Sequence, residues 1–181
     1  MSLLQLARAY TVFARDGELL PLTLVKSGAL VGGEKVISTE AAHEVRAMLE
    51  LAVQNGGTGP RARIMGWRVA GKTGTAHLAI AGGYSRNRYA ALFCGIVPAG
   101  NPRLVGVVVI RDAGGHGGEY FGGLVSAPVF REVMSGALRL LDIPPDNVQQ
   151  WYAGGPVTPA PPPAPPPEAV ATARRAQGTT P

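Results

Sequence analysis

Apolar residues recur at three- and four-residue steps in three stretches of the chain, and this spacing predicts three helices. The first helix ends at Asp16-Gly17, and the second begins at the capping residue Ser38 and ends at Asn55-Gly56-Gly57. The third begins near Ser126 and is closed by Pro144-Pro145. The apolar faces expected to be buried are Leu3, Leu6, Ala7, Tyr10, Phe13 and Ala14, then Ala41, Val45, Met48, Leu49 and Ala52, and finally Phe130, Val133, Met134, Ala137 and Leu141.

Between the second and third helices the pattern changes to strands. Three extended stretches are expected at Trp67–Lys72, Arg88–Val97 and Leu104–Ile110, with a loop over residues 82–87 between the first two. The connection over residues 98–102 is too short for a crossover helix, so its two strands should be antiparallel. The sequence therefore predicts an α+β fold in which helices cover a three-stranded antiparallel sheet.

Proline divides the chain into a body and a tail. Nine of the 16 prolines fall within residues 156–181. Residues 1–151 are expected to form one domain, and residues 152–181 a disordered Pro/Ala-rich tail. The tail is expected to be a solvated spacer, and a ligand for an aromatic groove is the alternative.

Charge and composition exclude several classes of function. The 17 basic and 12 acidic residues give a net charge of +5, but no basic run is dense enough to indicate nucleic-acid binding. The longest apolar run, Leu104–Ile110, is far shorter than the roughly 20 residues of a membrane span. The N-terminus lacks the order of a signal peptide. The single cysteine, Cys94, excludes an intramolecular disulfide and is expected to be buried.

The stretch Gly71–Ala76 carries the candidate chemistry. Lys72 supplies an ammonium for an anion, and side-chain alternation places Lys72 and Gly74 on one face of a strand with Thr73 on the other. Gly74 should leave its face open to a ligand backbone, and Thr75 offers a hydroxyl and a main-chain N–H. This set suits a carboxylate-bearing peptide laid along the strand. An exposed lysine on an edge strand is the other interpretation of so short a motif.

Two neighbours of this stretch are weaker candidates. His77 is expected either to line the same cleft or to face solvent in a loop. Tyr120-Phe121 is expected to pack on the rim of the cleft or to anchor the last helix.

The lysine, threonine and glycine resemble the third motif of the penicillin-binding serine acyl-transferases. Three further blocks, in the same order, resemble other segments of that family. The four blocks are Leu3-Leu4-Gln5-Leu6-Ala7, Gly57-Thr58-Gly59, Lys72-Thr73-Gly74-Thr75-Ala76 and Gly122-Gly123-Leu124-Val125-Ser126-Ala127-Pro128-Val129-Phe130. They cover nearly all of the body, and they are most similar to the class B penicillin-binding proteins of the division type (FtsI-like), the septal peptidoglycan transpeptidases.

The resemblance implies a fold, a reaction and roles for these residues. The body would be part of a penicillin-binding-protein/β-lactamase-like transpeptidase fold that cross-links stem peptides by acyl transfer, without metal or organic cofactor. Lys72 would orient the incoming carboxylate and support proton transfer, and the hydroxyls of Thr73 and Thr75 would hold the carboxylate of D-Ala-D-Ala or of a β-lactam. The N–H of Thr75 would be an oxyanion donor. Other division proteins would be partners, and the whole protein would lie on the periplasmic face of the inner membrane.

The family's nucleophile is missing from the sequence. None of the six serines is followed three residues later by lysine, so Ser-x-x-Lys is absent. Ser85-Arg86-Asn87 fits the second motif, Ser-x-Asn, only by its letters, because it follows Lys72 instead of preceding it. We expect the chain to be the C-terminal half of a transpeptidase domain, inactive by itself.

Two alternatives stay open at this point. One is another serine acyl-enzyme with the same strand, namely a DD-carboxypeptidase, a β-lactamase or a β-lactam sensor. The other is a non-catalytic binding module.

Overall fold

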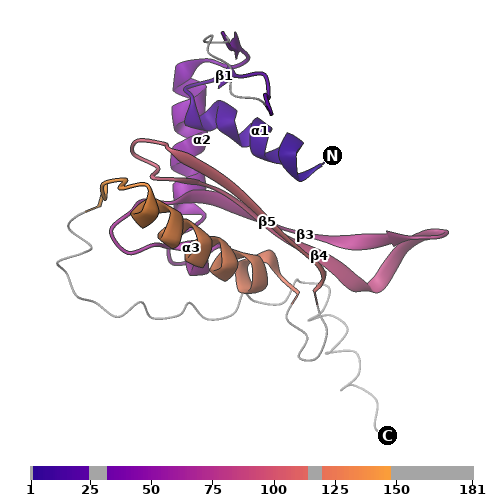
Figure 1. Ribbon diagram of the computed structural model, residues 1–181. Coiled ribbons are helices and arrows are strands. Elements are labelled where there is room, and N and C mark those ends of the chain that lie inside the picture. Colours follow the sequence, from indigo (N-terminus) through magenta and orange to yellow (C-terminus); the bar gives the residue numbers. More distant parts are fainter. Residues whose placement is uncertain (1, 25–31, 114–119, 148–181) are drawn as a thin grey trace, which may run out of the picture.

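The computed structural model describes residues 2–24, 32–113 and 120–147, and it has the α+β architecture expected from the sequence. A three-stranded antiparallel sheet lies at the centre, with helices on both sides of it (Figure 1). The Pro/Ala-rich tail expected at residues 152–181 lies outside the described residues, so its disorder stays a prediction.

The first two helices begin at serine caps, of which the sequence analysis predicted only Ser38. Helix α1 (Leu3–Ala14) follows Ser2, whose hydroxyl accepts from the N–H of Gln5 at 3.2 Å while its own N–H donates to the Gln5 side chain at 2.7 Å. Helix α2 (Thr39–Leu51) begins after Ser38, whose hydroxyl accepts from the N–H of Ala41. A short pair of strands, β1 (Glu18–Leu19) and β2 (Glu34–Lys35), and the 3-10 turn η1 (Pro60–Ala62) complete this part.

The central sheet has the order β3-β4-β5, which leaves β3 as an edge strand among the described residues. Its strands are β3 (Ala70–Ile80), β4 (Gly83–Val97) and β5 (Leu104–Ala113), and both pairings are antiparallel as predicted. The outer halves of β3 and β4 extend well beyond the helices as a two-stranded hairpin (Figure 1).

The prediction of a loop over residues 82–87 is wrong. Strand β3 continues to Ile80 and β4 already begins at Gly83, so the turn between them is short. Gly82 and Gly83 have φ of 85° and 148°, values that L side chains rarely adopt, and the pair lets the chain reverse within this space. The polar residues after this turn, which suggested a loop, belong to a strand exposed on the projecting hairpin.

Helix α3 (Gly122–Leu140) begins four residues before the predicted start at Ser126 and packs across β4 and β5. Pro128 therefore lies inside the helix and not in its first turn. A proline has no N–H to offer the carbonyl four residues earlier, here that of Leu124. The guanidinium of Arg61, on η1, donates to the Leu124 oxygen at 3.3 Å and takes the place of the missing helical hydrogen bond.

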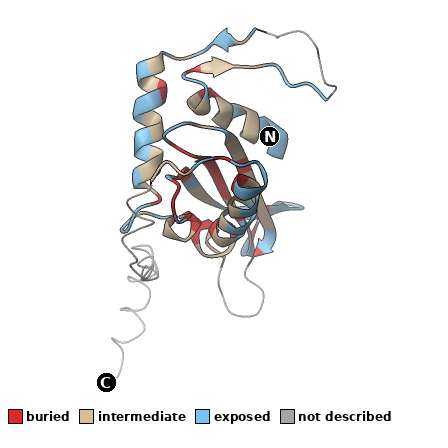
Figure 2. Ribbon diagram, turned by 60° about the vertical axis from the view of Figure 1, so that its left-hand side comes forward, coloured by how far each residue is buried: buried red, intermediate tan, exposed pale blue. Residues whose placement is uncertain are grey.

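The larger core cluster lies between α3 and the sheet (Figure 2), and a smaller one, built on Ala70, Ile96 and Ala99, lies on the other face under α1 and α2. Phe93 on β4 and Phe130 on α3 are fully buried, with ring centroids 4.8 Å apart. Trp67 is buried beside them, and its indole N–H donates to the Pro144 carbonyl. Cys94 is also buried, as predicted, and burial raises the pKa of its thiol to about 12, which keeps it protonated and unreactive at neutral pH.

Several helix positions predicted to be buried are exposed instead. Leu3 on α1, Met48 on α2, and Val133 and Leu141 at α3 are all more than half exposed. On α3 the fully buried residue of the last turns is Leu138. Periodicity located each apolar face to within one residue step, but a step of one turns a side chain by about 100°, enough to move it from core to surface.

No helix among the described residues is long and apolar enough to cross a membrane.

Candidate functional site

The candidate site follows the open edge of β3. Its register with β4 pairs Lys72 with Cys94 and Thr73 with Phe93, so these two neighbours project from opposite faces of the sheet. Thr75, two residues beyond Thr73, lies on the face of Thr73, which is the face that α3 covers. Alternation along the strand is thus as the sequence predicted.

The lysine and two hydroxyls come together at one end of this edge. The ammonium of Lys72 donates to the hydroxyl of Thr58 at 3.2 Å and lies 3.4 Å from both the carbonyl and the hydroxyl oxygen of Thr73. The hydroxyl of Thr73 in turn donates to that of Thr58 at 2.9 Å. One ammonium and two hydroxyl groups, exposed and adjacent, form an arrangement that can bind a carboxylate.

Thr58 was not among the candidate site residues. It precedes η1 in the loop after α2, 14 residues before Lys72. The signal that could have identified it was present, because Gly57-Thr58-Gly59 is one of the blocks that carry the family resemblance.

Thr75 contacts the start of α3. Its hydroxyl oxygen accepts from the N–H of Gly122 at 3.3 Å, which orients the hydroxyl and leaves its hydrogen available for a ligand. The two glycines that open α3 permit this close approach. A Cβ on Gly122 would overlap the Leu92 carbonyl and lie 2.7 Å from that of Gly74, and a Cβ on Gly123 would overlap the carbonyl of Thr58. The absence of both side chains lets the end of α3 lie directly against the site.

Gly74 does not leave open space beside Lys72, contrary to the sequence prediction. The side chain of Leu92, its partner on β4, lies over it, and a Cβ on Gly74 would come within 2.8 Å of the Leu92 Cγ. The glycine makes room for a neighbour in the protein instead of for a ligand. The ligand-accessible part of the motif is therefore Lys72 with the hydroxyls of Thr73 and Thr75.

A row of aromatic rings in contact continues from the site along the hairpin. His77 lies on β3 and not in a loop, and its ring centroid is 4.6 Å from that of Tyr89. Tyr89 stacks on Tyr120, with ring centroids 4.0 Å apart and an interplanar angle of 13°. Tyr120 contacts Phe121 at 4.4 Å, just before α3. The Nδ1 of His77 lies 2.7 Å from the Ser85 carbonyl oxygen, which is consistent with an Nδ1–H donor and an Nε2 free to accept.

The residues that match Ser-x-Asn by their letters lie away from the Lys72 cluster. Ser85 and Asn87 bond to each other on β4, in the hairpin beyond His77, and not beside Lys72. In residues 2–24, 32–113 and 120–147 no three His, Cys, Asp or Glu side chains gather as metal ligands.

An ion pair closes the outer end of the sheet. The guanidinium of Arg88 on β4 makes two hydrogen bonds, at 2.9 and 3.0 Å, to the carboxylate of Asp112 on β5. The hydrogen bond from Arg88 lowers the pKa of the Asp112 carboxyl below its usual range, and the same bond raises the pKa of Arg88. Both groups are exposed, so solvent screens their attraction.

Comparison with known proteins places this geometry in a family. Residues 1–135 match the model of the penicillin binding protein transpeptidase domain. Pseudomonas aeruginosa has a probable peptidoglycan D,D-transpeptidase, PbpC, that is 46% identical over 145 residues, which is 80% of this chain and 25% of that protein. The peptidoglycan D,D-transpeptidase FtsI of Escherichia coli is 43% identical over 143 residues, 79% of this chain and 24% of that protein.

A solved structure agrees with the sequence matches. The TP domain of penicillin-binding protein 3 from Burkholderia pseudomallei superposes with a TM-score of 0.72 and 45% identity, over 81% of this chain and 44% of that one. The chain spans about a quarter of the length of these curated relatives. On the extent of the family match and the identity to these relatives, this chain belongs to the penicillin-binding protein transpeptidase domain family.

Proposed function

We propose that this chain forms the Lys-Thr-Gly wall of the acyl-donor site in a peptidoglycan D,D-transpeptidase. The observation that carries the proposal is the cluster of the Lys72 ammonium with the Thr58 and Thr73 hydroxyls on the open edge of β3. The relatives described above bear that enzyme name. They lend no support to a carboxypeptidase, a β-lactamase or a sensor.

In the proposed reaction, Lys72, Thr73 and Thr75 bind the donor peptide and stabilise the charge that develops on it. The terminal carboxylate of a D-Ala-D-Ala peptide, or that of a β-lactam, is bound by Lys72 and by the hydroxyls of Thr73 and Thr75. A serine hydroxyl attacks the carbonyl of the penultimate residue, and the N–H of Thr75 stabilises the oxyanion that forms. The terminal D-Ala leaves as the free amine, and the amine of a second stem peptide then attacks the ester and releases the serine. The sequence has no Ser-x-x-Lys, so that serine comes from outside it.

The proposed setting is septal cell-wall synthesis at the periplasmic face of the inner membrane, with other division proteins as partners. It is supported by the identity to FtsI of Escherichia coli. No organic cofactor, metal ion or nucleic acid enters the proposed reaction.

The test is a chimaera in which this chain replaces the matching 145 residues of the P. aeruginosa relative. Intact-mass spectrometry after incubation with benzylpenicillin should show one adduct per chimaera, and none on this chain by itself. A soluble, folded chimaera without an adduct would contradict the proposal and favour a non-catalytic binding module. An adduct on a serine of the isolated chain would contradict the assignment of the nucleophile.

A further inference from the structure

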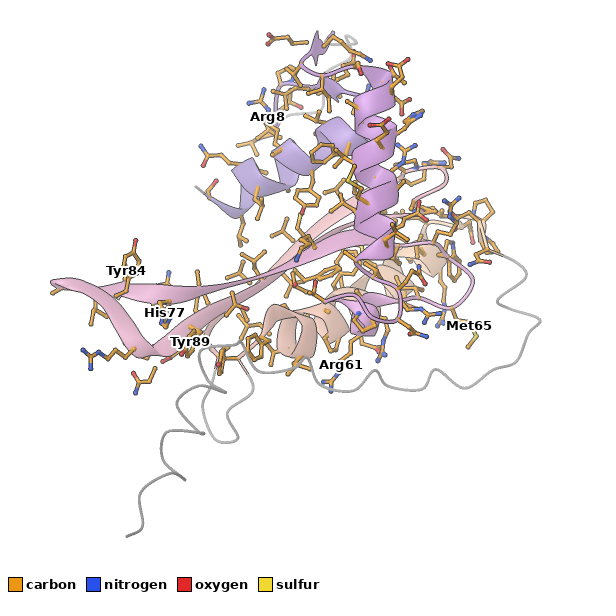
Figure 3. All side chains as sticks on the ribbon, turned by 180° about the vertical axis from the view of Figure 1, so that it is seen from behind. Arg8, Arg61, Met65, His77, Tyr84 and Tyr89 are labelled. Carbon is orange, nitrogen blue, oxygen red and sulfur yellow. The ribbon has the colours of Figure 1, made fainter. Side chains whose placement is uncertain are left out.

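The most exposed aromatic side chain among the described residues is Tyr84, at 74%. It stands at the start of β4, next to the turn of the projecting hairpin, and lies beyond His77 and Tyr89 near the free end (Figure 3). Its partner across the hairpin is Ala79, and the neighbouring Ile80 is half exposed. No ring contact joins Tyr84 to another aromatic of the described part of the chain. A single exposed tyrosine is common on protein surfaces, so the case for a ligand rests on where this ring lies relative to the site at Lys72.

The position of the carboxylate site on β3 sets the direction in which a bound peptide runs, and that direction is towards Tyr84. Lys72 and Thr73 fix the carboxyl end of the peptide, so the rest of it must leave along β3 in one direction. Ala70 and Gly71, on one side, are buried. Ala76 and His77, on the other side, are exposed and lead into the hairpin. A peptide that adds to the open edge of β3 therefore extends towards Tyr84.

The lengths of the hairpin and of the peptide agree. Ala79, opposite Tyr84, is four residues beyond Thr75 and six beyond Thr73, so it lies about 13–20 Å along the strand at roughly 3.3 Å per residue. A stem peptide of about five residues spans at most roughly 17 Å when extended. The end that carries the amino sugar thus reaches the hairpin tip when the other end is bound at Lys72.

The chemistry of the tip suits a sugar. A pyranose ring presents a face of C–H groups to an aromatic ring and hydroxyls around its rim, and tyrosine offers an apolar ring with a polar end. Arg86, two residues along β4, is exposed, and in residues 2–24, 32–113 and 120–147 no carboxylate pairs with it. It is available for the acidic groups that a stem peptide carries.

We propose that Tyr84, at the tip of the β3–β4 hairpin, binds the N-acetylated amino sugar to which the stem peptide is attached. The inference rests on the proposed function, because the site at Lys72 sets the position of the peptide. Tyr84 is then a specificity residue that distinguishes a glycan-linked stem peptide from a free one.

Calorimetric titration of the full chain tests this with three ligands: a disaccharide-pentapeptide, the same pentapeptide without sugars, and a glycan strand stripped of peptide. The chain lacks Ser-x-x-Lys, so binding is measured without acylation. We expect the disaccharide to tighten binding of the pentapeptide about tenfold, and Tyr84→Ala to abolish that gain. Tyr84→Phe should retain it, because the ring face is kept. Met65→Ala, at an exposed apolar residue before the sheet, should have no effect.

Failure of the inference and failure of the proposed function give different results. The absence of any sugar-dependent binding, or a gain that survives Tyr84→Ala, overturns the inference even if the pentapeptide binds. Binding of the stripped glycan through Tyr84, with no binding of the pentapeptide, supports the inference and counts against the carboxylate site. A change of oligomeric state in Tyr84→Ala with an unchanged sugar gain assigns the tip to a protein contact and also overturns the inference. Thermal melts should coincide for all variants.

Discussion

The inner and outer halves of the β3–β4 pair are built in different ways. The inner half, residues 70–76 with 90–97, lies against α3, where Phe93 and Phe130 exclude solvent and glycines bring backbones into contact. The outer half, residues 77–89, projects past the helices (Figure 1), and its ring contacts run from His77 through Tyr89 to Tyr120. The strand pair is therefore packed into the core where we propose that a carboxylate binds, and it is exposed where we propose that the rest of the substrate lies.

Removal of Phe130 should produce the largest loss of stability. The ring is fully buried against Phe93, and deletion of such a ring costs about 3–5 kcal/mol through lost burial and a cavity. Phe130→Ala is compared by chemical denaturation with Val133→Ala, which truncates an exposed residue of the same helix and should change stability by less than about 0.5 kcal/mol. Equal effects of the two variants would mean that α3 does not anchor the inner half.

A methyl group on Gly122 should have the next largest effect. Gly122→Ala forces a Cβ against the carbonyls of Leu92 and Gly74, and backbone atoms cannot move aside easily, so a loss of about 1–3 kcal/mol is expected. Gly136→Ala is the matched control, since a Cβ there meets nothing within 4 Å. It should stabilise α3 by roughly 0.5–1 kcal/mol. Thermal melts that move in the same direction for both variants would contradict the packing described here.

Much of this packing could be predicted from the sequence, but not the part that shapes the site. Periodicity located three helices and three antiparallel strands, and the Lys72–Thr75 stretch was recognised by its letters and its context. The contact between Thr58 and Lys72 joins a loop to a strand, and no spacing rule connects them. The early start of α3 was missed because Gly122-Gly123, poor helix formers by propensity, are selected there by close backbone approach.

The aromatic contacts should stabilise only the outer half of the strand pair against local opening. Tyr89→Leu removes two ring contacts, each worth about 0.5–1.5 kcal/mol beyond the area buried. Amide hydrogen exchange should accelerate over residues 77–89 and stay slow over residues 90–97, which α3 covers. Faster exchange over both halves would show that they are one cooperative unit.

The smallest effect is expected at the exposed pair of Arg88 and Asp112. Its hydrogen bond lowers the pKa of Asp112 in the folded state, so the pair stabilises the fold above the ordinary aspartate pKa of about 3.9 and stops doing so as pH falls through the lowered value. In Arg88→Gln the pKa of Asp112, followed by NMR titration of its carboxyl carbon, should rise towards the ordinary value. At neutral pH the melting temperature should barely change. An unshifted titration would show that the ion pair does not persist in solution.

The central claim is that Lys72 acts on the acyl donor, and the acylation rate of the chimaera by penicillin tests it most directly. Arginine keeps the charge, but its planar fork differs in shape and does not deprotonate. Lys72→Arg should lower the acylation rate at least tenfold, about 1.4 kcal/mol in barrier, with stability within ~0.5 kcal/mol of the parent. Lys35→Arg, at an exposed lysine bonded to the Asp16 carbonyl, should leave the rate unchanged. Stopped-flow acylation that is equally fast in Lys72→Arg and the parent would contradict the account.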